Sequence, residues 1–250
     1  MAVNILENKV AIVTGGTRGI GKAIAERLLD EKARVAICGT RQKSVDEIVR
    51  VLSAKGDVFG MAADISRIEE VRQFIAGVQR RFNTVHILIN NAGTGAFASV
   101  AETAPETWDA VIGVNLTGVY YCCHEILPIF LRAGGGDVVN IGSLAGTTAF
   151  AGGAAYNASK FGLIGFSEAM MLDYRHHGVR VSLVLPGSVN TEFGRRSATA
   201  GHSETDSQDK NNWKIAPEEI AETVVNLLQM PPRTTVSRVE VRPSRPAGKT

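Results

Sequence analysis

The stretch Thr14-Gly15-Gly16-Thr17-Arg18-Gly19-Ile20-Gly21 decides the fold of this chain of 250 residues. It directly follows an apolar run at residues 10–13 and precedes a segment whose apolar residues recur at spacings of three and four. That order predicts a buried strand, a tight glycine turn and a helix. Glycines let the backbone approach a pyrophosphate, and the helix N-terminus offers free N–H groups. The stretch therefore predicts a dinucleotide site, the alternative being a tight turn without a ligand.

The same alternation of strand and helix continues along the chain. Apolar runs at residues 35–38, 87–89, 138–141 and 181–185 suit strands buried on both faces, and helix-length segments separate them. We therefore expect one α/β domain over residues 1–250, a Rossmann-type doubly wound parallel sheet of about seven strands with helices on both faces.

Two segments depart from this alternation. Residues 194–214 are polar and lack an apolar period, which predicts either a surface loop or a lid over a substrate. Pro217 then opens a new helix, because proline suits a first helical turn. Residues 243–250 are expected to form an irregular tail.

Composition excludes several classes of protein. The 27 basic and 25 acidic residues give a net charge of +2, so we expect no nucleic-acid partner. Cys38, Cys122 and Cys123 fit small core residues, and the histidines show no ligand spacing with them, so we expect no metal site. The longest apolar stretch, residues 119–131, is interrupted and too short to span a bilayer. We expect no membrane partner and, without a signal peptide, a cytoplasmic protein.

The residues after the second expected strand indicate which dinucleotide binds. NAD sites usually place an acid there to accept the ribose hydroxyls, but residues 32–45 contain none. They contain Arg34, Arg41 and Lys43 instead, and Arg18 lies within the glycine turn. Arginine suits a 2′-phosphate, so we expect NADP(H). The alternative is that these basic residues are merely solvated.

Tyr156 and Lys160 form the candidate catalytic pair. Their spacing of four places them on one face of a helix. An ammonium group stabilises the phenolate and lowers the tyrosine pKa, which makes proton transfer feasible. Ser143 follows the run at residues 138–141, so it should lie at a carboxyl strand end facing the same crevice.

With these motifs the chain resembles the short-chain dehydrogenase/reductase family from about Lys9 to Pro243, and within it the NADPH-dependent β-ketoacyl-carrier-protein reductases. The matching motifs are the glycine turn, Asp64, Asn90-Asn91-Ala92-Gly93, Asn115, Ser143, Tyr156-Asn-Ala-Ser-Lys160 and Pro186-Gly187.

The resemblance implies a role for each matching residue. Tyr156 would protonate the carbonyl oxygen, Ser143 would hydrogen-bond it, Lys160 would bind the nicotinamide ribose, and Asn115 would support a water-linked proton relay. Cofactor contacts are implied for Gly15, Thr17, Arg18, Gly19, Ile20, Gly21, Arg41, Asp64, Ile65, Asn91, Ala92, Gly93, Pro186, Gly187, Val189 and Thr191. On local chemistry alone, residues 64–70 also suit a helix cap by Ser66 with Glu69 three residues on.

The expected activity is NADPH-dependent reduction of a ketone or β-keto thioester to a secondary alcohol, with Tyr156 as general acid. The alternatives are oxidation of a polyol, sugar or steroid alcohol with NADP, or a dinucleotide sensor without turnover. Phe97, Phe150 and Trp213 are either apolar walls of the substrate pocket or ordinary packing residues. The resemblance also implies a homo-oligomer, a tetramer or a dimer, formed through residues 108–131 and 154–177.

Overall fold

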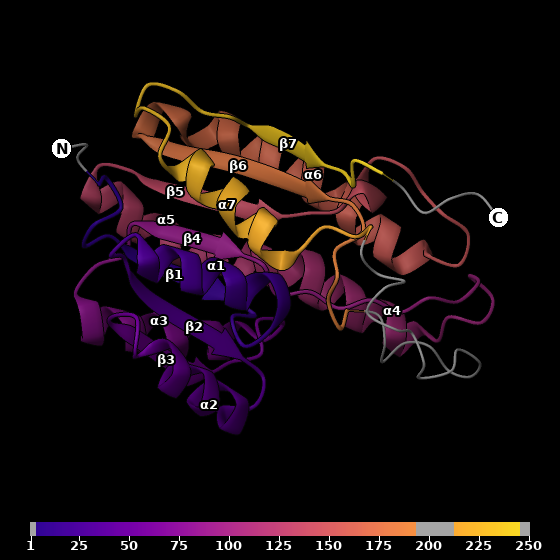
Figure 1. The fold of residues 1–250 in the computed structure, drawn as a ribbon. Coiled ribbons are helices and arrows are strands. Elements are labelled where there is room, and N and C mark those ends of the chain that lie inside the picture. The colour runs from indigo at the N-terminus through magenta and orange to yellow at the C-terminus, as the bar shows by residue number, and fades with distance from the viewer. Residues whose placement is uncertain (1–3, 194–212, 246–250) are drawn as a thin grey trace.

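Seven parallel strands form one sheet in the order β3-β2-β1-β4-β5-β6-β7 (Figure 1). The computed structural model describes residues 4–193 and 213–245. The strands are β1 (Val10–Thr14), β2 (Arg34–Gly39), β3 (Val58–Ala62), β4 (Ile87–Asn90), β5 (Gly136–Ile141), β6 (Val179–Pro186) and β7 (Arg238–Val241). The predicted Rossmann-type sheet is confirmed. The loop predicted at residues 194–214 lies outside the described residues except for Trp213 and Lys214, and the division into one domain stays a prediction.

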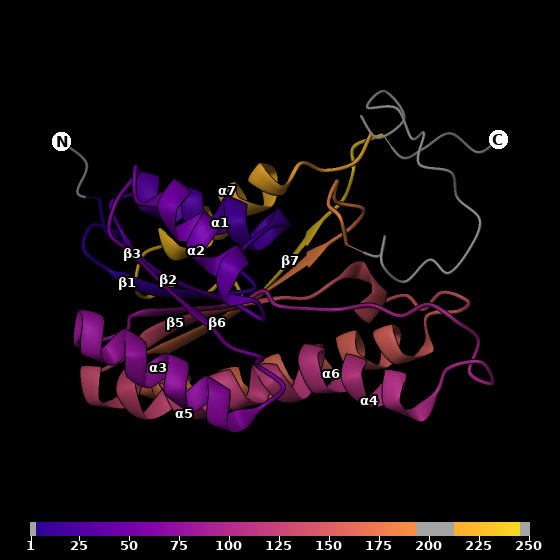
Figure 2. The ribbon, with the colours of Figure 1, turned by 90° about the horizontal axis from the view of Figure 1, so that it is seen from below.

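Helices cover both faces of this sheet (Figure 2). One layer holds α1 (Gly19–Asp30), α2 (Gln42–Leu52) and α7 (Pro217–Leu228). The other holds α3 (Ile68–Phe82), α4 (Pro105–Ile112), α5 (Gly118–Ala133) and α6 (Ala154–Tyr174). Each layer encloses its own apolar cluster, because alternate side chains of the buried strands point to opposite faces. Thus Ile12 packs with the α3, α5 and α6 side, and its neighbour Val13 with the α1 and α7 side.

The chain order of the strands reverses at β1, which pairs with β2 on one side and β4 on the other. Ligands of open α/β sheets bind at such a switch point, outside the carboxyl ends of the strands. The glycine turn after β1 and the segment after β4 meet there.

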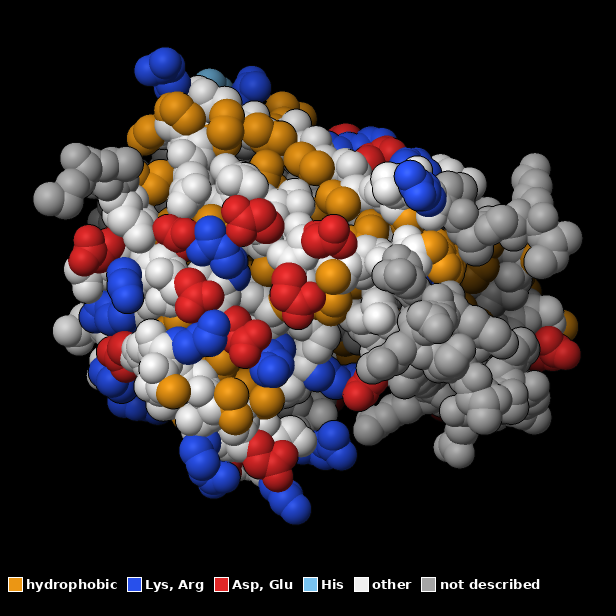
Figure 3. Space-filling view, in the orientation of Figure 1, with side chains coloured by type: hydrophobic (Ala, Val, Ile, Leu, Met, Phe, Trp, Pro, Cys, Tyr) orange, Lys and Arg blue, Asp and Glu red, His pale blue; other side chains and the backbone are white. Residues whose placement is uncertain are grey.

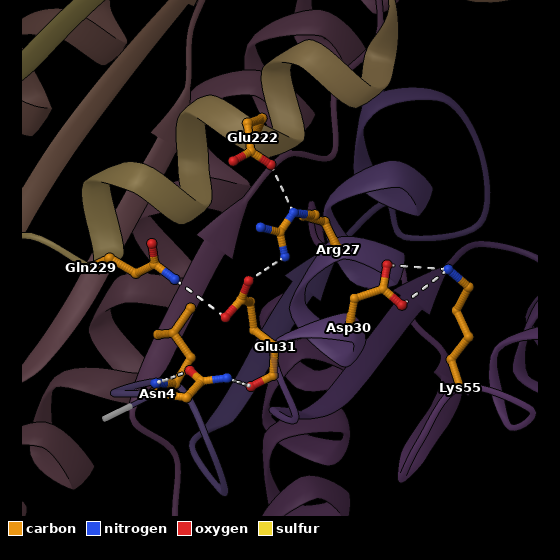
Figure 4. A network of polar contacts seen from close by, with 8 residues as sticks. Asn4, Arg27, Asp30, Glu31, Lys55, Glu222 and Gln229 are labelled. Carbon is orange, nitrogen blue, oxygen red and sulfur yellow. Dashed lines mark hydrogen bonds and ion pairs between the residues drawn. The ribbon is translucent and has the colours of Figure 1, made fainter. Parts of the chain in front are cut away.

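Helix α7 supports this region, although it is distant in sequence. Arg27 of α1 donates to Glu222 of α7 at 2.7 Å, and Gln229 donates to Glu31 at 3.2 Å (Figure 4). Pro217 stands in the first turn of α7, as predicted. The C-terminal helix therefore holds α1, whose N-terminus carries the glycine turn.

Helices α4 and α5 are joined by one π-helical turn, Gly113–Thr117. Together, the run from Pro105 to Ala133 is long and apolar enough to cross a membrane by length and composition. In this structure α5 buries Cys122, Ile126 and Phe130 in the core. Packing against the sheet therefore accounts for the buried apolar residues of this run, and 39% of its most apolar window is buried.

Charge is mixed on the molecular face shown in Figure 3. Acidic and basic side chains alternate over α1, α2 and α7 without a patch of one sign. This face shows none of the concentrated positive charge that nucleic-acid binding requires.

Candidate active site

The glycine turn after β1 is locked to the segment after β4. The backbone N–H groups of Asn91 and Ala92 both donate to Thr14 Oγ1 at 3.0 Å. Asn91 Nδ2 donates in return to the carbonyl oxygens of Thr14 and Gly15, at 2.9 and 3.2 Å. The Asn91 amide is therefore committed to holding the turn.

Gly15 and Gly21 cannot be replaced without a clash against the joined segments. Gly15 has a φ of +64°, and a Cβ there would come within 2.8 Å of the Ala92 Cα. A Cβ at Gly21 would strike the Asn91 amide and the Gly15 carbonyl oxygen. The close approach of two backbone segments therefore needs glycine at both positions. Gly21 acts in this packing and does not line the cavity.

A cavity of about 720 Å³ lies at the carboxyl ends of the strands. Its lining brings together most of the residues predicted for the site, from segments far apart in sequence. These are Gly15, Thr17, Arg18, Gly19, Ile20, Asp64, Ile65, Asn91, Ala92, Gly93, Ser143, Tyr156, Lys160, Pro186, Gly187, Val189 and Thr191. Of the predicted set, Gly21, Arg41 and Asn115 lie outside this lining.

Tyr156 is buried at the first turn of α6, beside Ser143. Burial raises the pKa of Tyr156 above its ordinary value, and a side-chain hydrogen bond with Ser143 acts in the opposite direction. Ser143 itself is fixed, because its Oγ accepts the N–H of Ala145 at 3.1 Å in the short 3₁₀ turn after β5. The hydroxyl groups of Ser143 and Tyr156 are thus held together at the carboxyl ends of the strands.

Lys160 lies one turn further along α6. Its Nζ donates to the carbonyl oxygen of Ile141 at 3.0 Å and lies 5.8 Å from the centroid of the Tyr156 ring. Burial lowers the pKa of Lys160 to about 8. The ammonium group is therefore present at neutral pH, close enough to favour a phenolate at Tyr156.

Asn115 lies in the π-helical turn and is completely buried. Its Oδ1 accepts the N–H of Thr94, and its Nδ2 donates to the Thr94 carbonyl oxygen, both at 2.8 Å. Nδ2 also donates to Ser159 Oγ at 3.0 Å, and Ser159 in turn donates to the carbonyl oxygen of Tyr156. The side chain thus connects the loop after β4 to the helix that carries Tyr156.

Arg18 and Arg41 flank a second hollow of about 210 Å³ beside the main cavity. Thr40 and Glu47 also line it. Arg18 Nη1 donates to Glu192 at 3.2 Å across the mouth of the main cavity. Arg34 lies at the other, amino end of β2, where it donates to the carbonyl oxygen of Asn8. Of the basic residues Arg18, Arg34, Arg41 and Lys43, only Arg18 and Arg41 therefore line this hollow, and the acidic Glu47 lines it as well.

Asp64 forms a local turn at the cavity wall. Its Oδ1 accepts both the N–H and the hydroxyl of Ser66, at 3.0 and 2.7 Å. The prediction of a helix cap by Ser66 with Glu69 is wrong, because α3 begins at Ile68, after Arg67. Glu70 accepts the Asp64 N–H instead.

Phe193 begins the loop expected to shape the substrate pocket, and Lys214 ends the segment predicted as a loop or lid; both line the cavity. The sequence does not predict several further lining residues, among them Thr40, Ser188 and Glu192. Their only shared signal is position, directly after a strand end or next to the polar segment at residues 194–214. Trp213 lies outside the lining, and its ring contacts the Lys214 ammonium at 5.9 Å. Within residues 4–193 and 213–245, no three His, Cys, Asp or Glu side chains are placed to hold a metal ion.

Comparison with known proteins gives one consistent result. The sequence profile of the family described as short chain dehydrogenase matches residues 9–201. An uncharacterized oxidoreductase of Staphylococcus aureus is 31% identical over 241 residues, which are 96% of this chain and 100% of that protein. D-threitol dehydrogenase of Mycolicibacterium smegmatis is 34% identical over 193 residues, 77% of this chain and 74% of the relative.

The structural comparison agrees. The crystal structure of an actinorhodin polyketide ketoreductase variant with NADPH superposes with a TM-score of 0.87 and 31% identity. The match covers 97% of this chain and 98% of the ketoreductase.

Proposed function

The chain belongs to the short-chain dehydrogenase family, and from that premise we propose that it reduces a ketone or β-keto thioester to a secondary alcohol with NADPH. Members of this family are oxidoreductases that interconvert carbonyl and alcohol groups with NAD(P). One observation carries the finer proposal. A single cavity joins Ser143 and the buried Tyr156 and Lys160 to the glycine turn, and Arg18 and Arg41 line a second hollow beside it.

The residues present fit a dinucleotide with a 2′-phosphate. The glycine turn leaves its backbone free of side chains, and the N-terminus of α1 points positive charge toward the pyrophosphate position. Arg18 and Arg41 would hold the 2′-phosphate in the second hollow, where two guanidinium groups outweigh the carboxylate of Glu47. Thr40 stands where an NAD enzyme would carry an acid.

The chemistry follows from the three polar side chains. Bound NADPH would supply a hydride to the carbonyl carbon. Tyr156 donates a proton to the carbonyl oxygen as negative charge develops there, and Ser143 donates a hydrogen bond to the same oxygen. The product is a secondary alcohol, and Tyr156 is left as a phenolate. The Lys160 ammonium stabilises that phenolate until a proton returns from solvent.

The test is NADPH consumption with thioesters, diketones, cyclic ketones and keto sugars, with NADH run in parallel. Tyr156→Phe should lower turnover about 100-fold or more, since a positioned general acid contributes at least that much. NADPH should still bind to the variant, because the hydroxyl is not part of the glycine turn. Full turnover by Tyr156→Phe would contradict the assignment of the general acid, and a preference for NADH would contradict the reading of Arg18 and Arg41.

The similarity to D-threitol dehydrogenase supports a second candidate, oxidation of an alcohol with NADP. The same residues serve both directions, with Tyr156 acting as base in oxidation. Comparing kcat/KM for ketone with NADPH and for the matching alcohol with NADP decides the preferred direction. A protein that binds NADPH but turns over no substrate of either kind would favour the sensor.

We also place the oligomer contact on the face of α5 and α6. Tyr120, Phe161 and Leu172 are large apolar side chains exposed on these two helices. Exposed apolar groups of this size favour burial against a second copy. Light scattering at micromolar concentration should show a dimer or tetramer. Leu172→Glu should dissociate it, and Val51→Glu, an equally exposed site on α2, should not.

The cytoplasm is the proposed location. Cys38, Cys122 and Cys123 are all free and buried, which suits a reducing compartment. Fractionation of cells that express a tagged protein tests this directly.

A further inference from the structure

Two phenylalanine rings contact the ring of Tyr156, and a third packs against one of them. Phe97 lies on the loop after β4, Phe150 on the loop after β5, and Phe193 on the loop after β6. The ring centroids of Phe97 and Phe193 lie 5.8 and 5.6 Å from that of Tyr156. The centroid of Phe150 lies 5.8 Å from that of Phe97. We call Phe97, Phe150 and Phe193 the aromatic frame.

The frame is exposed where the reaction takes place. Phe97, Phe150 and Phe193 are 40%, 45% and 42% exposed, whereas the Tyr156 residue between them is 9% exposed. A single exposed apolar side chain is common, but a group of them at one point marks a surface that binds an apolar partner. Here that surface surrounds the proton donor.

The backbone is built to hold these rings in place. A Cβ at Gly95 would come within 2.9 Å of Phe97 and 3.2 Å of Phe193, so both rings occupy the space that a side chain would take. Gly153 makes the same room for Phe150. The carbonyl oxygen of Phe150 accepts a hydrogen bond from Asn157 at 3.1 Å. A bridge between Ala98 and Gly153 then joins the two loops.

The loops that carry Phe97 and Phe150 are electrically neutral. Neither residues 94–101 nor residues 144–153 include a charged side chain. A polyol or keto sugar needs many hydrogen-bond partners, and a charged substrate needs an opposite charge. Next to Tyr156 these loops present aromatic rings instead.

We propose that the site takes a neutral ketone with a flat ring beside the carbonyl group, that is, an aryl or ring-fused ketone, and that Phe97 and Phe193 set this preference. The proposal rests on the proposed reductase function. The substrate ring packs against the two phenylalanine rings while its carbonyl oxygen reaches Tyr156 and Ser143. Phe150 packs against the ring of Phe97 and helps to hold it in place. Each ring contact should contribute about two- to tenfold in affinity beyond the area it buries.

The test compares kcat/KM with NADPH for three neutral ketones: 2-tetralone, its carbon-matched open-chain counterpart 2-decanone, and erythrulose, a keto sugar. The variants are Phe97→Leu and Phe193→Leu. Val100→Ala is the matched control, because Val100 is 78% exposed on the same loop as Phe97 and makes no ring contact with Tyr156. A second readout is calorimetric titration of 2-tetralone into the Tyr156→Phe protein with NADP.

The wild-type enzyme should prefer 2-tetralone over 2-decanone about tenfold or more, and each Leu variant should reduce that ratio about two- to tenfold. Val100→Ala should leave it unchanged. Preference for 2-decanone or erythrulose, or an unchanged ratio in both Leu variants, overturns the proposal. If no ketone turns over with either cofactor, the proposed function fails on its own. The titration then tests the aromatic frame by itself. Binding of 2-tetralone to the Tyr156→Phe protein that weakens when Phe97→Leu is added supports the proposal. Absent or unchanged binding overturns it.

Discussion

Lys160 is a buried cation, and its ammonium group donates a hydrogen bond to the backbone carbonyl oxygen of Ile141. Its pKa of about 8 lies below the ordinary lysine value, because burial disfavours the charged form. Below pH 8 the folded protein keeps an ammonium group that water would solvate better in the unfolded chain. As pH rises from about 8 to 10.5, the folded state loses this proton while the unfolded state retains it, so stability rises with pH.

Lys160→Met should therefore stabilise the protein and inactivate it. The gain should be on the order of 2 kcal/mol at pH 7 and should shrink toward pH 10. Urea denaturation at both pH values measures it, and NADPH consumption measures the loss of turnover. Lys55→Met, which removes a surface ion pair with Asp30, is the control and should change stability little. A destabilised Lys160→Met protein at pH 7 would contradict this account.

Glu192 competes for Arg18 with the expected 2′-phosphate. Both side chains of the pair are at least half exposed, so the pair itself is weak. Glu192→Gln should tighten NADPH binding about two- to fivefold, because the guanidinium no longer has to leave a carboxylate. NADH, which lacks the phosphate, should bind unchanged. Fluorescence titration of both cofactors measures this, and in an Arg18→Ala background the effect of Glu192→Gln should vanish.

The sequence predicts which side chains lie at the site better than it predicts what each of them contacts. Tyr156 and Lys160 were expected on one helix face, and the structure places both at the cavity. The side chains of Asn91 and Asp64 are occupied by local hydrogen bonds to the glycine turn and to Ser66, respectively. Which partner a short polar side chain takes depends on a backbone that only the folded chain brings near. Phe193 is expected only as part of a loop that shapes the pocket, and the sequence does not predict its contact with Tyr156, which spans 37 positions.

Among the elements, the π-helical turn between α4 and α5 has a definite task. It places the Asn115 side chain inward, where it satisfies both backbone groups of Thr94 and contacts Ser159. The loop after β4 and the start of α6 are thereby coupled. Residues that share such a network have effects on stability that are not additive.

Asn115→Ala should destabilise the protein by about 2–3 kcal/mol, because it leaves buried polar groups without partners. Ser159→Ala should cost about 1 kcal/mol, since it removes one bond of the same network. The double variant should cost less than the sum, because the bond between the two residues is then counted only once. Urea denaturation of the three variants closes this cycle. Strict additivity would show that the two elements are not coupled through these side chains.

The strands show where a pattern in sequence stops being informative. The five apolar runs predicted as strands correspond to β1, β2, β4, β5 and β6, which are buried on both faces. The sequence pattern does not predict the positions of the outer strands β3 and β7. All of β3 is half-buried, and β7 alternates exposed with half-buried residues over four positions, so neither offers a continuous apolar run. The sequence does not predict the π-helical turn at Gly113–Thr117, although asparagine at position 115 is unfavourable within a helix.

In the molecule as a whole, the cavity and a hydrogen bond that stabilises the fold lie at opposite ends of the strands. The cavity lies at the carboxyl ends of the strands, whereas His86 lies at the amino end of β4. There its Nδ1 accepts the backbone N–H of Val10 at 2.9 Å, next to the start of β1. Burial lowers the pKa of His86, and the charges of Lys9 and Arg34 lower it further. A ring nitrogen that accepts a backbone N–H carries no proton, so the fold requires neutral histidine here.

Low pH should therefore destabilise the protein through the contact at the amino ends of the strands, opposite the cavity. Above pH 6.5 His86 is neutral in both states. Below that pH the unfolded chain takes up a proton that the folded chain does not, so stability decreases as the pH falls. His86→Asn keeps an acceptor without a titrating group. Its urea midpoint should fall less between pH 7 and pH 5 than that of the wild-type protein. His86→Ala should show the same flatter slope from a lower midpoint at pH 7, because the acceptor is gone too. Equal slopes in all three proteins would assign the acid sensitivity to other groups.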